Sequence, residues 1–192
     1  MRHAALLAVL LIVAGCGGST TPTATTQPAG STTAEACPPN AGAGTGPQSS
    51  SGKPSDTMLL TAVKVDSDTC SDRVVFDFRP DSAEKPGFRV EYRPAEEAQT
   101  EDASGRHIPV AGKAFLVVRF EPAATADLSG AKLERTYTGP RRLQPVGMRF
   151  IREIVKTGDF EAVLTWTIGL SEQRPFTVTS SGSPPRLTIE IG

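Results

Sequence analysis

The sequence predicts an all-β protein, an antiparallel two-sheet β-sandwich or flattened barrel of about nine strands. From Thr57 onward, apolar and polar residues alternate over short segments, as they do in strands that bury one face. Clusters of Gly, Pro, Asp and Ser separate these segments and indicate turns. No segment shows helical spacing over three turns.

The strongest alternation lies in GDFEAVLTWTIGL, which predicts one half-buried strand. One face of this strand would carry Phe160, Ala162, Leu164, Trp166, Ile168 and Leu170. The same pattern predicts three further strands, whose inward residues would be Val74, Phe76 and Phe78, then Phe88, Val90 and Tyr92, and finally Leu187, Ile189 and Ile191.

Other segments complete the predicted sheets. The stretch 114–120, AFLVVRF, is apolar on both faces and is typical of a central strand. Weaker patterns predict strands over 58–65, 133–137, 148–155 and 175–179. The stretch PAEEAQTEDASG, beginning at Pro94, lacks an apolar stripe, so we expect a loop with at most one helical turn.

The first residues are typical of a secretion signal that ends at Cys16. Arg2 and His3 precede the apolar run 4–14, and small residues stand directly before the cysteine. The run would rise only about 16 Å as a helix, against roughly 30 Å of hydrocarbon in a bilayer. The segment ending at Cys16 resembles the bacterial lipobox. We therefore expect residues 1–15 to be removed and Cys16 to carry the lipid that holds the protein on the outer face of the cell membrane.

Residues 16–56 form the predicted second region, a disordered linker rich in Thr, Pro, Gly and Ser. It contains too few large apolar side chains to offset the entropy cost of ordering. Cys37 and Cys70 remain once Cys16 is lipidated, and an extracytoplasmic location permits these two cysteines to form a disulfide. The predicted β-domain then spans residues 57–192.

Composition excludes several functions. The formal net charge of −1, without a basic stripe, gives no case for nucleic-acid binding. The predicted mature chain has one histidine, His107, so we expect neither a catalytic zinc site nor a Ser-His-Asp triad, and no enzymatic activity. We expect no cofactor and no metal. The acidic stretch with Asp66, Asp68 and Asp72 lacks the glycine and glutamate of an EF-hand loop and is interpreted as a solvated turn.

Five stretches in order carry a resemblance to a known family: DRVVFDF, PGFRVEY, AFLVVRF, GDFEAVLTWTIGL and PFTVTSSGSPPRLTIEI. Together they resemble the AMIN-like domain of lipoproteins from high-GC Gram-positive bacteria, over about 57–192. The resemblance implies a distant relation to the AMIN module, a β-sandwich that attaches cell-wall amidases and secretins to peptidoglycan. A role in binding the cell envelope is therefore an expectation from the resemblance.

The candidate ligand-binding residues lie in YTGPRRLQP, where Arg141 and Arg142 follow a Gly-Pro turn near Tyr137. Their guanidinium groups match the geometry of carboxylate or phosphate. Trp166 is assigned to the core rather than to sugar stacking, because Leu164 and Ile168 share its face.

Three functions remain open. The first is a non-catalytic binding module for peptidoglycan, an anionic wall polymer or an envelope protein. The second is a carrier for an apolar small molecule held between the sheets, and the third is an unrecognised envelope enzyme.

Overall fold

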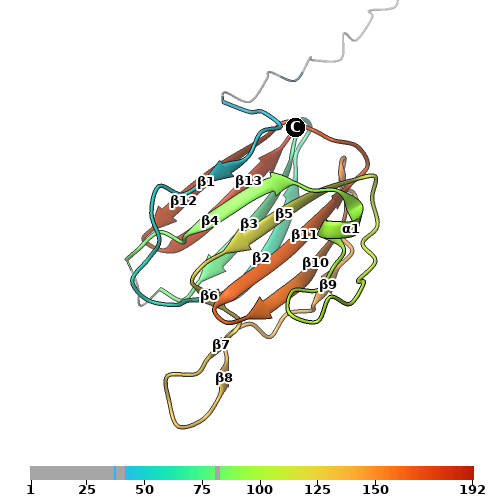
Figure 1. The fold of residues 1–192 in the computed structure, drawn as a ribbon. Helices are drawn as coiled ribbons and strands as arrows, with labels where there is room; N and C mark the ends of the chain where they lie inside the picture. Colours follow the sequence, from blue (N-terminus) through green and yellow to red (C-terminus); the bar gives the residue numbers. More distant parts are fainter. Residues whose placement is uncertain (1–36, 38–41, 81–82) are drawn as a thin grey trace, which may run out of the picture. The chain divides into compact units, whose positions relative to one another are not determined.

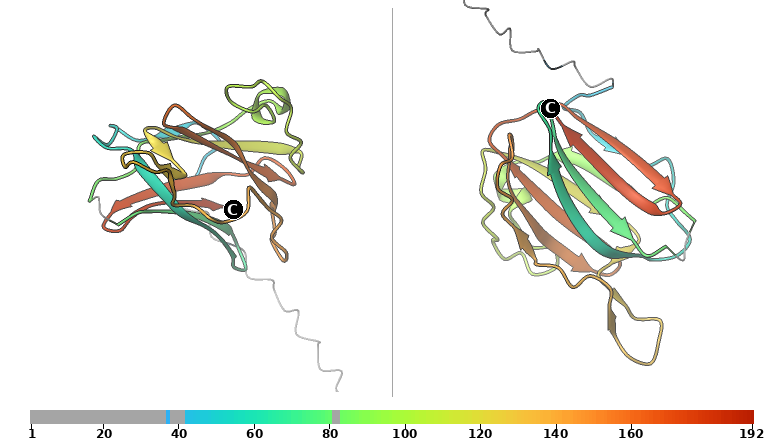
Figure 2. Two further views of the ribbon diagram at one scale, coloured as in Figure 1. Left: turned by 90° about the horizontal axis from the view of Figure 1, so that it is seen from below. Right: turned by 180° about the vertical axis from the view of Figure 1, so that it is seen from behind.

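The structure, a computed structural model, describes Cys37 and residues 42–80 and 83–192. Its strands form two main sheets that face each other as a β-sandwich, with neither sheet closed into a barrel (Figures 1 and 2). The prediction of a mostly antiparallel all-β fold is confirmed. More strands are present than the nine expected, because five of the strands are only two residues long.

The six-stranded sheet lies in front in Figure 1 and is antiparallel throughout. In spatial order it contains β1 (Gln48–Ser49), β4 (Phe88–Tyr92), β5 (Ala114–Phe120), β11 (Val163–Leu170), β10 (Ile151–Phe160) and β9 (Arg142–Leu143).

The five-stranded sheet lies behind it and has one parallel pair, between its last two strands. Its order is β12 (Phe176–Gly182), β13 (Pro185–Ile191), β3 (Asp72–Phe78), β2 (Met58–Ser67) and β6 (Ala123–Ala124). A separate ribbon pairs β7 (Ala126–Asp127) with β8 (Glu134–Arg135).

Alternating residues of both sheets fill the space between them. The predicted inward residues of β3 and β13 are at most 2% exposed. Phe76 stands at the centre, with its ring 5.1 Å from that of Phe120 and 6.0 Å from that of Trp166, both edge-on. Such aromatic pairs add roughly 0.5–1.5 kcal/mol each to the free energy gained by burial. The assignment of Trp166 to the core is confirmed, since its side chain is fully buried.

A second, smaller apolar cluster covers the outer face of the six-stranded sheet. The helical turn expected after Pro94 is α1 (Ala95–Ala98), and Ala98 packs with Ile108 and Val110 over Phe115 and Val155. Figure 1 shows α1 in front of this sheet. This cover explains why β5 is apolar on both faces: Leu116 and Val118 belong to the main core, and Phe115 belongs to the second cluster.

The prediction of one strand through GDFEAVLTWTIGL is wrong, because the segment is a hairpin. Glu161 and Ala162 both have positive φ angles, of 50° and 58°, and form the turn between β10 and β11. Two consecutive residues with positive φ are typical of the turn that matches strand twist in hairpins. The turn places Phe160 at the end of β10 with 54% of its surface exposed, while the residues from Leu164 to Leu170 stay buried.

Residues 42–50, assigned to the linker by sequence, form a strap along one side of the sandwich. Gln48 and Ser49 pair with β4 of the six-stranded sheet. Gly44 exchanges two backbone hydrogen bonds with Phe176 of β12, in the other sheet. The Gln48 carboxamide continues this contact: Nε2 donates to the Phe176 carbonyl at 2.8 Å, and Oε1 accepts from the Val178 N–H at 3.1 Å. The strap thus satisfies polar groups at the edge of both sheets, which explains why a segment poor in apolar residues is ordered.

Candidate functional site

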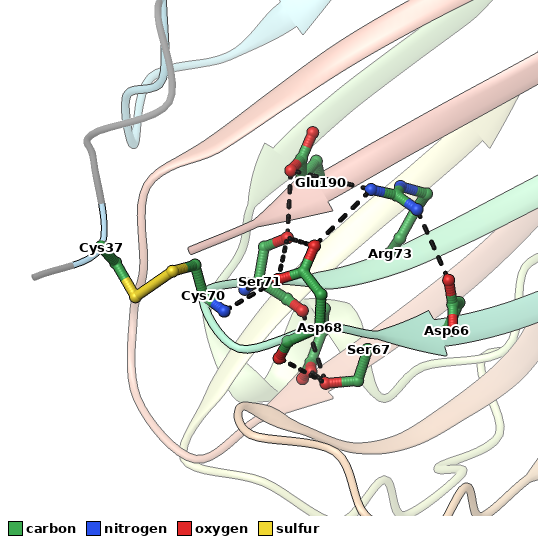
Figure 3. A network of polar contacts seen from close by, with 9 residues as sticks. Cys37, Asp66, Ser67, Asp68, Cys70, Ser71, Arg73 and Glu190 are labelled. Atoms are coloured by element: carbon green, nitrogen blue, oxygen red, sulfur yellow. Dashed lines mark hydrogen bonds and ion pairs between the residues drawn. A yellow bond between two sulfur atoms is a disulfide. The ribbon is translucent and has the colours of Figure 1, made fainter. Parts of the chain in front are cut away.

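The turn between β2 and β3 holds the disulfide that joins the N-terminal segment to the β-domain. Cys37 and Cys70 are bonded, as expected, with their Cα atoms 5.3 Å apart (Figure 3). The Asp68 carboxylate accepts the N–H groups of Cys70 and Ser71, both at 2.8 Å, and these bonds, the Cys70 bond foremost, lower its pKa. The expected lipidation site, Cys16, and the expected signal, 1–15, lie outside the described residues.

Asp72 departs from the expected solvated turn, because its side chain is fully buried. Its carboxylate accepts the N–H groups of Arg149, Phe150 and Ile151 at 2.7–3.0 Å, together with the Ser67 hydroxyl at 2.6 Å. Burial alone would raise the pKa of Asp72, but these hydrogen bonds outweigh burial and lower it. Asp72 therefore ties the start of β10 to the disulfide turn and serves the fold.

Of the three predicted ligand-binding residues, Tyr137 lies inside the protein. Its side chain is 7% exposed, and its ring stands edge-on at 5.6 Å from that of Trp166. Its hydroxyl donates to the Pro140 carbonyl at 2.9 Å, and burial raises the pKa of this hydroxyl. In this position Tyr137 holds the loop that leads to Arg141 and has no surface to offer a ligand.

Arg141 and Arg142 do border a concave surface, a depression of about 340 Å³. Arg106 and His107 line it as well, over a floor formed by Ile108, Pro109 and Val155. Both predicted arginines are paired with carboxylates. Arg141 contacts Glu101 at 2.5 Å and donates from Nε to the Lys156 carbonyl, while Arg142 contacts Glu153 at 2.5 Å and donates to the Pro109 carbonyl.

The two carboxylate partners, Glu101 and Glu153, differ in whether their arginine is free to bind a ligand. The pKa of Glu101 falls to about 2, through the Ser104 hydroxyl first and then through Arg141 and Arg106, so Glu101 stays ionised beside two half-exposed arginines. Glu153 is 1% exposed; burial would raise its pKa, but Arg142, the Ala111 N–H and Gln144 outweigh burial and lower it. Arg142 is thus needed to neutralise a buried charge, whereas Arg141 is the arginine that a ligand can recruit.

A neighbouring depression of about 330 Å³ shares Arg141 and extends the site toward Phe160. Lys156, Asp102 and Ser104 also line it. Phe160 is the exposed aromatic of this chain: the single tryptophan, both tyrosines and the other seven phenylalanines are buried or half-buried. We call the two depressions the Arg141 site, defined by Glu101, Arg106, His107, Arg141, Arg142 and Phe160. An elongated surface with paired charges and one exposed ring suits a polar chain better than a compact reactive molecule.

Sequence reasoning missed Glu101, Arg106 and Phe160. Glu101 and Arg106 lie in the loop after α1, 35 or more residues before Arg141, and no local pattern joins the two segments. Phe160 was assigned to the core by alternation, and only the turn at Glu161 and Ala162 reverses that assignment.

Within the residues that the structure describes, no group of three or more His, Cys, Asp or Glu side chains is placed to hold a metal ion. His107 lies exposed on a loop and bridges to Thr100. The same residues contain no helix long and apolar enough to cross a bilayer.

Comparison with known proteins agrees with the resemblance. The family model for the AMIN-like domain matches residues 58–192, which include all strands from β2 to β13. No curated protein and no solved structure matches the chain. Because the match covers more than half of the sequence, the chain belongs to the AMIN-like domain family.

Proposed function

We propose that the protein is a non-catalytic lipoprotein, attached to the outer face of the cell membrane through Cys16, whose AMIN-like domain binds peptidoglycan or a wall polymer through the Arg141 site. The AMIN-like domain suggests a role in binding the cell envelope. The observation that carries the proposal is the elongated Arg141 site, where a recruitable arginine and the one exposed aromatic ring lie on neighbouring depressions.

The position of the site supports the proposal. The start of β10 lies beside the disulfide turn, because Ile151 donates to Asp72, two residues after Cys70. Phe160 stands at the opposite end of this ten-residue strand. At about 3.3 Å per residue, roughly 30 Å separate Phe160 from the end at which the N-terminal segment is bonded. A domain tethered at its disulfide end leaves the opposite end, with Phe160, clear of the attachment point and accessible to the wall.

A carrier for an apolar molecule finds less support. Phe76, Phe120 and Trp166 are fully buried between the sheets and occupy the space that such a ligand would need. An envelope protein as partner stays an outcome of the binding test below.

The first test measures binding to the wall. The variant Arg141→Ala/Phe160→Ala should weaken cosedimentation with purified peptidoglycan at least tenfold, because it removes a charge-assisted hydrogen bond and a stacking surface worth about 2–4 kcal/mol together. Arg142 is not substituted, because its loss would leave the buried Glu153 without its charge partner and would destabilise the folded protein.

The matched control is Leu133→Ala/Arg135→Ala, which removes an exposed apolar side chain and an exposed arginine from the β7–β8 ribbon. This control should bind as the unchanged protein does. Equal retention of both double variants would refute the assignment of the Arg141 site, and absence of retention for the unchanged protein would refute wall binding and favour an envelope protein.

The second test concerns the lipid. Expression of Cys16→Ala in a bacterium with a lipoprotein pathway should release the protein into the medium or leave its signal uncleaved, because no acyl chains hold it on the bilayer. The measurement is the distribution of the protein between membrane and medium, with its mass. A variant that stays in the membrane with the mass of the unchanged protein would exclude lipidation at Cys16.

A further inference from the structure

Two arginines face each other directly on the outer face of the six-stranded sheet. Arg89 of β4 and Arg119 of β5 are partners in the antiparallel register. Residues paired in this way have Cβ atoms about 5 Å apart, and like charges in such a pair destabilise a sheet. Their neighbours Val90 and Val118 point into the core, so both guanidinium groups stand on the solvent side, where each side chain is about half exposed.

The opposed arginines border a depression of about 400 Å³ that lies apart from the Arg141 site. The end of the strap and the residues that follow it supply the other wall: the serines at 49–51 and Lys53 line it opposite the two strands. Lys53, Arg89 and Arg119 therefore converge from three separate segments of the chain. Gly87 lets the walls approach, because a Cβ at this position would meet the Glu121 carbonyl oxygen at 2.4 Å.

Most donors of the two arginines are not used by the protein. Arg89 contacts Glu91 through Nη2 at 2.5 Å, and Arg119 contacts Glu121 through Nη2 at 3.3 Å. Within the described part of the chain, Nε and Nη1 of both side chains have no hydrogen-bond partner. An arginine carries five N–H donors, so each keeps three for a ligand in the depression.

The charge balance of the depression is positive. Three cations line it together with one carboxylate, Glu121, which contacts Lys53 at 2.6 Å, and Glu91 pairs with Arg89, so the group has one positive charge in excess. Lys53 and Arg119, in that order, lower the pKa of Glu121, so this carboxylate remains ionised and binds no proton near neutral pH. The excess of positive charge contrasts with the net charge of −1 of the whole chain.

We propose that Lys53, Arg89 and Arg119 form a second binding site, for a phosphate group. A phosphate presents three acceptor oxygens and carries close to two negative charges, which matches three cationic side chains arriving from three directions better than a single flat carboxylate does. Glu91 and Glu121 each neutralise one of the opposed arginines, and a phosphate would supply acceptors for the N–H donors that these carboxylates leave unused. The phosphodiester of a wall polymer and that of a phosphatidylglycerol headgroup keep two of these acceptor oxygens and one negative charge, so both are expected to bind the same donors more weakly than inorganic phosphate does.

The test is titration of the purified full chain with inorganic phosphate, followed by calorimetry and by amide NMR shifts. All proteins carry Cys16→Ala, so no acyl chain contributes to binding. We expect the shifts to centre on residues 49–53, 89 and 119, and we expect Arg89→Gln/Arg119→Gln to weaken phosphate binding at least tenfold. Arg135→Gln/Arg152→Gln, which removes two exposed arginines elsewhere, should bind phosphate as the Cys16→Ala protein does.

Two further probes separate the sources of the phosphate. One is poly(glycerol phosphate), and the other is vesicles of phosphatidylglycerol and phosphatidylcholine. Binding of either probe that requires both Arg89 and Arg119 supports the site and identifies its source. Equal binding of phosphate to the two double variants, or shifts confined to the Arg141 site, would overturn the proposal. Because the readouts are the dependence on Arg89 and Arg119 and the position of the amide shifts, their outcome is distinguishable from binding of a wall polymer at the Arg141 site.

Discussion

Asp72→Asn is expected to lower the free energy of unfolding by about 3–4 kcal/mol, since each hydrogen bond to a charged acceptor contributes roughly 1.5–3 kcal/mol. The buried carboxylate accepts three backbone N–H groups at the start of β10 and one hydroxyl. An asparagine has one oxygen left to accept, and it turns an amide donor toward groups that are themselves donors. The loss falls on the junction between the two sheets, because Asp72 belongs to β3 and its partners precede or begin β10.

The same residue is expected to make stability depend on acid. The pKa of Asp72 in the folded protein lies below its ordinary value of 3.8. A lowered folded pKa contributes stability that is fully present above the unfolded pKa and is lost as the pH falls through the folded pKa. Stability from this group should therefore be complete at pH 6 and decline below about pH 4. Asp72→Asn should show a flatter decline over that range.

Chemical denaturation at a series of pH values measures both effects. Asp66→Asn is the matched control: it changes a carboxylate at the end of β2, on the other side of the same turn, whose side chain is 72% exposed and pairs with Arg73 at 3.5 Å. The control should keep the free energy of unfolding within about 0.5 kcal/mol of the unchanged protein. A loss below about 1 kcal/mol in Asp72→Asn would show that the N–H groups find other acceptors.

The strands were predictable because one face of each meets the core. In β3 and β13 every second residue is buried, so the alternation of apolar and polar residues in the sequence matches the burial pattern of the strand. Alternation failed at Phe160, where the residue lies in phase with Leu164 and Trp166 although a turn separates them. The two-residue turn pairs Phe160 with Val163 and so places Phe160 on the face opposite to Leu164. Without Asn-Gly or Gly at the centre of the turn, nothing in the local sequence predicts this reversal.

Local sequence patterns could not predict contacts between segments that lie far apart in the chain. The strap has few apolar residues, and its order comes from backbone and carboxamide bonds of Gly44 and Gln48 to a strand about 130 residues later. Arg141 was identified as an exposed candidate, but its partner Glu101 lies 40 residues earlier in a loop. Tyr137 shows the converse: a residue near the candidate arginines in sequence lies within the core, because its ring completes the packing around Trp166.

Loss of the disulfide is the second large effect. Cys37→Ser/Cys70→Ser should lower the free energy of unfolding by about 3–4 kcal/mol, the chain-entropy cost of opening a loop of this size. The two cysteines are 33 residues apart, and the loop between them contains the strap and all of β2. The Asp68 carboxylate accepts the backbone N–H at position 70, so serine at this position keeps the turn intact. The effect should therefore come from the lost bond and not from a damaged turn.

Hydrogen exchange separates the two ways in which the bond can act. If the disulfide only restricts the unfolded chain, the double variant loses stability, but the ratio between the exchange rates of the strap amides and those of the rest of the domain does not change. The strap amides are those of Gly44, Ser50 and Val178, which bond the strap to the sheets. If the disulfide also holds the strap in the folded protein, these amides exchange faster than those of β3, because local opening then precedes global unfolding. We expect the second result, since Gly44 and Gln48 hold the strap to β12 by exposed or half-exposed polar contacts alone. Unchanged denaturation midpoints in the double variant and in the unchanged protein treated with dithiothreitol would show that the strap and the sheets need no covalent tie.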